Sequence, residues 1–306
     1  MEIIRGLHNL RAMHRGNVVT IGNFDGVHLG HQAIIKHLKT LALKYDVPAT
    51  LITFHPNPLD FFAGDNAPPK LSGFRDKMQL LQHYGVDRVI CIPFNQTFAD
   101  LNAETFITDI LLKRLHTKHL VIGDDFQFGK NRQGDFHLLQ QYGEKHHFTV
   151  ENTDTFLVNQ QRASSTLVRQ TLTENDLTKT HTLLGRPYHV SGKVSHGDKR
   201  GRTIGFPTAN IRLKQQIAPT NGVYAVKITG LAEPQQGVAN IGVRPTVDGH
   251  SYLLEIHLFD FNQDIYGQRI NIYFEHFIRP EKKFSDLDTL VAQITQDTET
   301  AKSLLT

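Results

Sequence analysis

Short runs of β-branched and aliphatic residues alternate with helical patterns over the first half of the chain. These runs predict strands at Val18–Ile21, Ala49–Phe54, Arg88–Ile92, Leu120–Ile122 and Phe148–Val150. Between the first two strands, apolar residues recur at spacings of three and four, which predicts a helix from about residue 31 to residue 45. Strands that alternate with helices favour a parallel sheet covered on both faces. We therefore predict an α/β domain whose ligands bind at the carboxyl ends of its strands.

Helical patterns fill the remaining segments up to residue 184. They span Phe74–Tyr84, Glu104–Leu115, Phe136–Tyr142, Thr166–Leu172 and Asn175–Leu184. Thr173 and Asp176 have the spacing of a capping box at the start of the last of these helices, and Gly185 and Pro187 mark its end. We place a domain boundary there, with one domain over residues 1–184 and a second over residues 185–306.

From Tyr188 onward the pattern changes to short strands separated by glycine-rich turns. Residues 252–259 alternate with period two, and both faces of this segment are partly apolar, as in a closed barrel. Further strands are expected at Tyr188–Ser195, Val223–Thr229, Gln236–Ile241 and Arg269–Phe277. We predict a small antiparallel β-barrel. Ser285 and Asp288 suggest the start of a final helix, whose single apolar stripe predicts that it packs on the barrel.

The composition fits an ordinary globular protein of two domains. Of 306 residues, 39% are hydrophobic and 21% charged, and the net charge of +3 is too small to indicate a nucleic-acid-binding protein. Cys91 is the only cysteine, which rules out an intrachain disulfide and suits a reducing cytosol; its apolar neighbours predict a buried thiol. No apolar run approaches the roughly 18 residues of a membrane span, and no signal peptide is evident. The expected location is the cytoplasm.

Residues 22–32 read GNFDGVHLGHQ and carry the first candidate site, because they join a predicted strand to the start of a predicted helix. Free N–H groups and the helix dipole attract anions at such a start. Gly22 lies in the turn, and Gly30 allows close approach of a nucleotide. His28 and His31 supply donors that stabilise charge on phosphorus, and Asn23 either binds phosphate or forms the turn. Our hypothesis is a site that transfers nucleotidyl groups from ATP; the alternative is a pair of capping histidines.

Two further clusters follow in the first domain. Residues 123–129 read GDDFQFG; Phe126 and Phe128 could form a slot for a flat ring and Asp125 could bind a ribose or a metal, or the segment is a loop with half-buried aromatics. The sequence leaves both readings open. At the start of a later helix, three hydroxyl residues stand before an arginine, and we favour an anion site there over simple capping by Ser165. This third cluster comprises Ser164, Ser165, Thr166 and Arg169.

Residues 196–210 read HGDKRGRTIGFPTAN and form a fourth cluster in the second domain. Glycines and cations together suit a loop that cradles phosphate, and the lack of interleaved surface aromatics opposes a nucleic-acid patch. The residues expected to bind phosphate are Gly197, Lys199, Arg200, Gly205 and Pro207.

Thr208, Asn210 and Glu255 are the candidate reacting groups of the second domain. Thr208 and Asn210 lie two residues apart, so in an extended segment their oxygens point the same way and could bind one Mg²⁺ ion. Glu255 stands inside an apolar strand, where a carboxylate needs a partner or a chemical role. It could act as a general base on a substrate hydroxyl, or it could pair with Arg244 or Arg269.

With these motifs, the chain resembles the bacterial bifunctional riboflavin kinase/FAD synthetase family. The most specific segments are GNFDGVHLGHQ, GDDFQFGKNRQGD and SSTLVR in the first domain, and HGDKRGRTIGFPTAN, NIGVRPTVDG and LLEIHLFDFNQDIYGQRINIYF in the second. The resemblance covers essentially the whole chain. It implies a Rossmann-like nucleotidyltransferase domain followed by a barrel of riboflavin-kinase type. It also implies phosphorylation of riboflavin to FMN, then adenylylation of FMN to FAD, with ATP as co-substrate and Mg²⁺ as cofactor in both reactions.

The resemblance also implies roles for individual residues. Glu255 would be the kinase base, and His28 and His31 would stabilise the reacting phosphates of the adenylyl step. Flavin contacts are implied for Asp125, Phe126, Phe128, Tyr224 and Arg244. Two departures from the family pattern, Ala163 before the serines and His55 where glutamate is more usual, concern only the shape of the adenylyltransferase pocket.

Two other classes of protein remain as alternatives. One is a flavin-binding or regulatory protein with inactive sites, which the intact candidate catalytic residues oppose. The other is an RNA-binding protein, because a His-x-Gly-His segment also occurs in tRNA synthetases; the weak net charge opposes it. We expect small molecules as partners, no nucleic acid and no membrane, and a monomer or weak oligomer.

Overall fold

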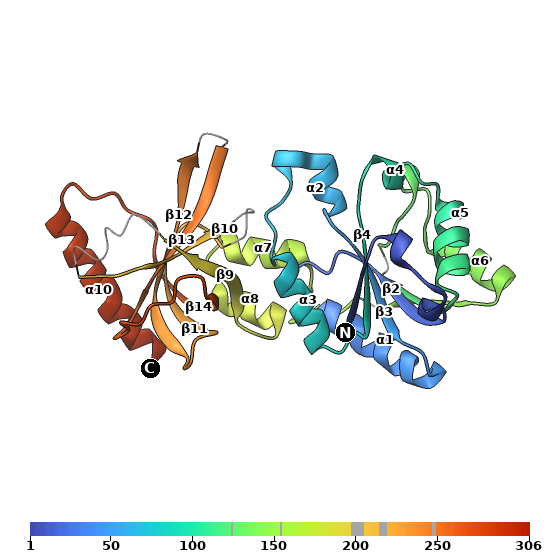
Figure 1. The fold of residues 1–306 in the computed structure, drawn as a ribbon, viewed down its shortest axis with the longest axis horizontal. Coiled ribbons are helices and arrows are strands. Elements are labelled where there is room, and N and C mark those ends of the chain that lie inside the picture. Colours follow the sequence, from blue (N-terminus) through green and yellow to red (C-terminus); the bar gives the residue numbers. More distant parts are fainter. Residues whose placement is uncertain (124, 154, 197–204, 214–218, 247–248) are drawn as a thin grey trace. The chain divides into compact units, whose positions relative to one another are not determined.

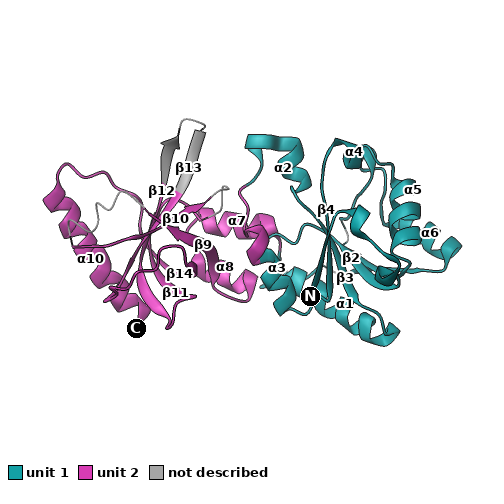
Figure 2. Ribbon diagram, viewed as in Figure 1, with its two compact units in different colours: residues 1–68, 77–163 teal, residues 69–76, 164–306 magenta. Residues whose placement is uncertain are grey.

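The chain forms two compact units in the computed structural model, which describes residues 1–306 except 124, 154, 197–204, 214–218 and 247–248. Unit 1 comprises residues 1–68 and 77–163, and unit 2 comprises residues 69–76 and 164–306 (Figure 2). The side chains of residues 243–252 also lie outside the described part.

A six-stranded sheet organises unit 1, and its neighbouring strands are all parallel (Figure 1). The order is β1-β4-β3-β2-β5-β6, so the chain crosses over the sheet between strands, as predicted for an α/β domain. The strands are β1 (Glu2–Arg5), β2 (Asn17–Ile21), β3 (Ala49–Phe54), β4 (Arg88–Ile92), β5 (Thr117–Gly123) and β6 (Thr149–Thr153). The helices are α1 (Leu29–Tyr45), α2 (Pro58–Ala63), α3 (Phe74–His83), α4 (Gln96–Ala99), α5 (Ala103–Thr105), the π-helix η4 (Phe106–Arg114) and α6 (Phe136–His146).

Successive strand residues point to opposite sides of the sheet, so both faces carry apolar side chains, and other elements cover both of them. On one face Val18 and Val121 pack with Leu38 of α1. On the other face Val19 and Ile52 join a larger core with residues of η4 and α6. This arrangement explains why the strands read as nearly continuous apolar runs rather than as alternating ones. Cys91 is buried in β4 as predicted, and burial raises the pKa of its thiol.

The amino ends of four strands are tied together by a buried polar network. Arg88 of β4 donates to the Glu2 carboxylate at 2.8 Å and to Asn17 Oδ1 at 2.8 Å. Asn17 Oδ1 also accepts from Thr50 of β3 at 2.7 Å, and its Nδ2 donates to Leu115 O at 2.8 Å. Because this network lies at the end of the sheet opposite the ligand-binding edge, its role is structural.

We expect Arg88→Ala to lower the free energy of unfolding by about 1–3 kcal/mol, because the buried Asn17 Oδ1 keeps Thr50 but loses its charged donor, and Glu2 keeps His14 but loses its arginine. The Arg88 guanidinium holds the pKa of Glu2 below its ordinary value, so this part of the stability is present above the unfolded-state pKa of Glu2 and is lost as the pH falls through the lowered value. Urea denaturation measures the effect. Arg114→Ala, an exposed arginine that donates to Leu7 O, is the control and should change stability little.

Unit 2 is built on a closed barrel of six antiparallel strands in the order β10-β13-β12-β11-β14-β9. The strands are β9 (Tyr188–Ser195), β10 (Ala209–Leu213), β11 (Gly222–Thr229), β12 (Gln235–Thr246), β13 (Gly249–Leu258) and β14 (Arg269–Arg279). Leu254 and Ile256 are fully buried in the barrel interior. Helix α10 (Leu287–Leu305) packs on the outer face through Ala301 and Leu305, against Val223 and Val238. The predicted barrel and its packed terminal helix are confirmed.

Helices α7 (Ser165–Thr173) and α8 (Leu177–Leu184) belong to the same compact unit as the barrel. Residues 69–76 join them there: Arg169 donates to Pro69 O at 2.6 Å, and Ser191 Oγ of β9 donates to the buried Asp76 carboxylate. The compact units therefore divide after Ala163, earlier in the chain than the functional boundary that we predict after residue 184.

Several local predictions differ from the structure. Asp176 itself caps α8 and Asp286 caps α10, because each aspartate lies directly before the helix and accepts an N–H of the first turn. The helix expected at 104–115 begins at Ala103, after an Asn102 cap, and continues as the π-helix η4. The short edge strand β1 was not predicted. In the described part of the chain, no helix is long and apolar enough to cross a membrane.

Candidate active sites

The turn between β2 and α1 brings the GNFDGVHLGHQ segment to the carboxyl edge of the sheet in unit 1. Phe24, Gly26 and Val27 all have positive φ, so the chain reverses sharply before the helix. Phe24 and Val27 are buried and anchor this strained turn. The first candidate site is therefore held rigidly at the place where ligands of parallel sheets bind.

His28 and His31 lie together at the start of α1. Their rings stack with centroids 3.7 Å apart, and the His31 N–H donates to Nδ1 of His28 at 3.4 Å, so His28 caps the helix. Burial, reinforced by the charges of His28 and Lys77, holds the pKa of His31 well below its usual value. The ring of His31 is thus neutral at neutral pH. Capping was the alternative to phosphate binding for this pair. His28 does cap the helix, and both rings still lie at the carboxyl edge of the sheet.

Two buried polar atoms at this edge have no hydrogen-bond partner among the residues that the structure describes: Asn23 Oδ1 and His31 Nδ1. A buried polar atom without a partner is costly, so both favour a ligand that supplies the missing bonds. Lys77, which the sequence analysis missed, brings a cation to the same edge. Its ammonium donates to Asn23 O at 3.0 Å and to Thr53 Oγ1 at 3.2 Å.

Two glycines of the segment stand at close approaches. A Cβ on Gly30 would lie 3.2 Å from the carbonyl oxygen of Ala163 and 3.2 Å from the His28 ring, and a Cβ on Gly22 would lie 3.0 Å from the Phe24 ring. Ala163 is buried at the start of the SSTLVR segment, so this departure from the family pattern lies directly beside the site. His55, the other departure, is exposed.

The rings of Phe126 and Phe128 stack on each other, with centroids 5.5 Å apart and planes 17° apart. Phe128 is buried in the core of unit 1, and a Cβ on Gly134 would collide with its ring. The two phenylalanines therefore form one apolar surface rather than the two walls of an open slot. Asp125 is exposed and pairs with Arg162 at 3.1 Å.

An aromatic wall at the carboxyl ends of β3 and β4 was not predicted from the sequence. Five rings pack in series with centroids 5.2–5.8 Å apart: Phe54, Phe61, Phe62, Phe94 and Phe98. The wall continues through Phe106 to Phe128. Phe62 is 70% exposed, so the wall presents an aromatic face at the surface. Only the run of two phenylalanines in residues 58–63 signalled it.

The hydroxyl residues before Arg169 open helix α7 in unit 2. Ser164, rather than Ser165, is the N-cap: its Oγ accepts from the Leu167 N–H at 3.2 Å. Thr166 is exposed in the first turn. Arg169 donates to Pro69 O. His28 and His31 belong to unit 1, so the shared role of the two clusters in phosphate binding stays a prediction.

The barrel brings together the candidate groups of the kinase half. Asn210 of β10 and Asn240 of β12 are the directly opposed neighbours of Glu255 on β13, one on each side. Directly opposed residues of antiparallel strands share a face, and here it is the outer one, because Leu254 and Ile256 fill the interior. We call Asn210, Glu255 and Asn240 the polar row. Asn210 is 5% exposed, and its Nδ2 donates to Thr208 O at 3.3 Å.

Thr208 stands just before β10, beside the polar row. Pro207 O accepts from the His257 ring at 3.0 Å, which holds this segment against β13. Gly205 has a φ of +85°, a conformation that favours glycine. Gly197, Lys199 and Arg200, expected to bind phosphate, lie outside the described residues.

The two flavin contacts implied for the barrel differ in setting. Tyr224 is fully buried; its hydroxyl donates to Asn175 Oδ1 at 2.9 Å, its ring packs against Phe274 and Phe277, and burial raises its pKa to about 12. The ring therefore has no exposed surface for a flavin here, and its binding role stays a prediction. Arg244 lies in β12, and its side chain is outside the described part.

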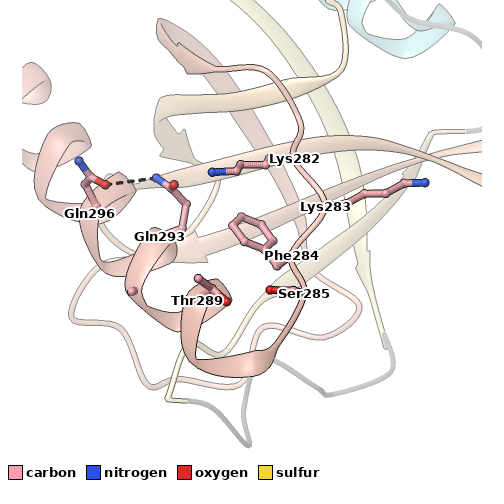
Figure 3. Close-up of a pocket in the computed structure, with 8 residues that line it drawn as sticks. Lys282, Lys283, Phe284, Ser285, Thr289, Gln293 and Gln296 are labelled. Atoms are coloured by element: carbon pink, nitrogen blue, oxygen red, sulfur yellow. Dashed lines mark hydrogen bonds between the residues drawn. The ribbon is translucent and has the colours of Figure 1, made fainter.

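A cavity of about 380 Å³ opens between the segment after β14 and the first turns of α10 (Figure 3). Phe284 forms its apolar surface, with Lys282 and Lys283 beside it and Gln293 on the helix. Glu281, next to this cavity, reaches the barrel: a Cβ on Gly242 would lie 2.8 Å from its Oε1. Gly242 and Asn240 share a face of β12, so this segment borders the polar row.

Comparison with known proteins identifies both halves. The family model for FAD synthetase matches residues 10–167, and the model for riboflavin kinase matches residues 184–305. Bifunctional riboflavin kinase/FMN adenylyltransferase from Escherichia coli K12 is 49% identical over 304 residues, covering 99% of this chain and 97% of that protein. The protein of the same name from Haemophilus influenzae is 49% identical over 304 residues and covers 99% of both chains. That from Pseudomonas fluorescens is 45% identical over 306 residues, with 99% and 98% covered.

A solved structure also matches over nearly the full length. It is described as a macrolide-efflux protein from Streptococcus pneumoniae, with a TM-score of 0.84, 30% identity and 99% of each chain covered. The efflux function named in that description refers to the Streptococcus pneumoniae protein alone. Two enzyme-family models and full-length bifunctional relatives show that the present chain forms FMN from riboflavin and then FAD from FMN. The chain belongs to the bifunctional riboflavin kinase/FMN adenylyltransferase family.

Proposed function

We propose that the polar row on the outer face of the barrel is the reaction centre of the riboflavin kinase. Phosphorylation requires a ribityl hydroxyl to lose its proton, and Glu255 is the carboxylate that would accept it. The proposal rests on the direct cross-strand pairing of Glu255 with Asn210, because it sets the base one strand, about 4.8 Å between backbones, from a residue whose side-chain oxygen suits Mg²⁺.

The residues beside Glu255 fit a magnesium ion that binds with ATP. Mg²⁺ takes few protein oxygens and completes its shell with phosphate and water, and Thr208 and Asn210 offer two such oxygens at one edge. Within the described residues, no group of three or more histidine, cysteine or acidic side chains could hold a metal by itself. When bound, the ion would neutralise charge on the ATP phosphates. Those phosphates would be held by the residues of the preceding loop: Gly197, Lys199, Arg200, Gly205 and Pro207.

Asn210→Ala should raise the Mg²⁺ concentration needed for half-maximal riboflavin phosphorylation by at least about tenfold, because one metal-binding oxygen is lost. A titration of Mg²⁺ at saturating ATP measures this, and Asn271→Ala on β14, whose amide donates to Thr229, is the matched control. An unchanged Mg²⁺ requirement in Asn210→Ala would remove Asn210 from the metal site.

For the adenylyl step, we propose that charge stabilisation and positioning dominate. The nucleophile is already an anionic phosphate of FMN, so no strong base is needed. Stacked at the start of α1, His28 and His31 would donate to the α-phosphate and the departing pyrophosphate. Asn23, Gly22 and Gly30 would form the floor of the nucleotide site. The α7 cluster of Ser164, Ser165, Thr166 and Arg169 would hold the leaving phosphates.

The aromatic wall gives the flavin ring of FMN a surface in unit 1. A planar ring gains apolar burial and stacking on exposed aromatic faces, and Phe62 offers such a face. We propose that the isoalloxazine ring binds along this wall, with Phe126 and Phe128 at its far end and Asp125 at the polar side. In the kinase half, Arg244 would contact the flavin, and Tyr224 stays a predicted contact whose ring is fully buried here.

The proposed setting is a cytoplasmic enzyme that acts on small molecules as a monomer or weak oligomer, without nucleic acid. The single cysteine and the net charge of +3 support this. The start of the riboflavin kinase match at residue 184 supports a functional boundary close to that residue. Analytical ultracentrifugation with and without tRNA tests both the oligomeric state and the absence of nucleic-acid binding.

A further inference from the structure

Asn240 is the one member of the polar row that is neither the proposed base nor a proposed metal ligand. It lies directly opposite Glu255 on β12, on the outer face of the barrel, while its sequence neighbours Ala239 and Ile241 are fully buried inside. A polar amide next to the proposed base, in an otherwise apolar stretch of strand, calls for a partner.

The amide oxygen of Asn240 is buried and accepts no hydrogen bond from any residue in the described part of the chain. Its neighbours explain why. Glu255 is an acceptor when ionised, Val223 on the other side is apolar, and Glu281, which borders the row near Gly242, is a second carboxylate. None of these three side chains can donate to Oδ1.

A ligand that fits this position must bring a donor to within one strand spacing of Glu255. The reacting hydroxyl of riboflavin has a single hydrogen, which it donates to the base. The hydroxyl on the adjacent ribityl carbon has its own hydrogen, and vicinal hydroxyls are close enough to serve two acceptors that lie side by side. ATP phosphates are acceptors and cannot satisfy a carbonyl oxygen.

We propose that Asn240 Oδ1 accepts a hydrogen bond from the ribityl hydroxyl next to the one that is phosphorylated, and so positions the reacting hydroxyl against Glu255. This inference rests on the proposed function of the polar row. It makes Asn240 a positioning and specificity residue for polyhydroxylated flavins: an analogue without that hydroxyl leaves a buried acceptor unpaired and should be rejected.

The test is a cycle of four measurements of kcat/KM for phosphorylation: wild type and Asn240→Ala, each with riboflavin and with 4′-deoxyriboflavin. Loss of either the amide or the hydroxyl alone should cost about tenfold, as expected for one hydrogen bond. Loss of both should cost little more than loss of one, because the same bond is removed. Losses that multiply to about 100-fold would overturn the proposal, as would full activity of Asn240→Ala with riboflavin.

Controls separate this outcome from other failures. FMN-to-FAD conversion by the same preparation, made in unit 1, should stay at the wild-type rate and so reports on folding. Asn240→Leu replaces the amide by an apolar group of similar size if the alanine variant is unstable. Asn271→Ala should keep the full wild-type dependence on the hydroxyl. Glu255→Ala is assayed in parallel and tests whether Glu255 is the base. If this variant remained active, the proposed function would fail, while the four-measurement cycle would still decide the role of Asn240.

Discussion

Glu255→Ala abolishes FMN formation and leaves FMN-to-FAD conversion intact; this is the larger of the two effects that we expect. A positioned general base contributes about 10²–10⁴-fold to a proton transfer, and alanine cannot accept the hydroxyl proton. Since Glu255 lies on the outer face of the barrel, between Asn210 and Asn240, its loss removes no interior packing. Chromatography of flavins after incubation with riboflavin, ATP and Mg²⁺ measures the first step, and a parallel incubation with FMN measures the second.

Glu275→Ala is the matched control for this variant. Glu275 also belongs to a barrel strand, β14, but lies outside the polar row, and we expect both reactions to continue near the wild-type rate. If Glu255→Ala phosphorylated riboflavin as fast as the wild type, Glu255 would not be the base, and its role would reduce to pairing with a neighbouring arginine.

The second large effect is expected from replacing His28 and His31 together by alanine. FAD formation should fall by about 10²–10³-fold or more, because the two groups that we propose to stabilise the reacting phosphates are lost. FMN formation from riboflavin should continue, so FMN should accumulate. Rates of FAD formation from FMN and ATP, with the release of pyrophosphate measured in the same samples, report the change.

His137→Ala serves as the control, since this exposed histidine of α6 interacts only with Gln141 among the contacts that the structure describes. A thermal melt of the double variant checks the fold, because His28 also caps α1. A folded His28→Ala/His31→Ala variant that made FAD at the normal rate would show that the first motif is not the phosphate site, and would leave the capping role alone.

The architecture could be predicted from hydrophobic periodicity, because the pattern of buried side chains determines which segments form strands and helices. Strands buried on both faces, such as β4, read as unbroken apolar runs, and the period-two alternation of β13 fits a barrel wall. The ends of the helices were predicted less well. Ser285 and Thr173 have the right chemistry for a cap, but Asp286 and Asp176 occupy the N-cap positions, which depend on where the backbone turns.

The candidate sites were predicted only in part, because local sequence motifs reveal some of their residues and the fold brings in the others. Some candidate residues belong to motifs that can be recognised in the sequence alone: His28, His31, Asn210 and Glu255. Other groups reach their sites only through the fold. Lys77 comes from a helix distant in the sequence, and the aromatic wall joins rings from β3, α2 and the end of β4. Asn240 gained meaning only from the strand register that sets it beside Glu255.

The central claim is that one chain carries two working sites that act in succession. A chromatographic time course of the purified protein with riboflavin, ATP and Mg²⁺ tests it most directly. We predict that FMN appears first and that FAD then forms at its expense. Flavin that stays bound as unchanged riboflavin, with neither product formed, would contradict the account and indicate a binding protein with inactive sites.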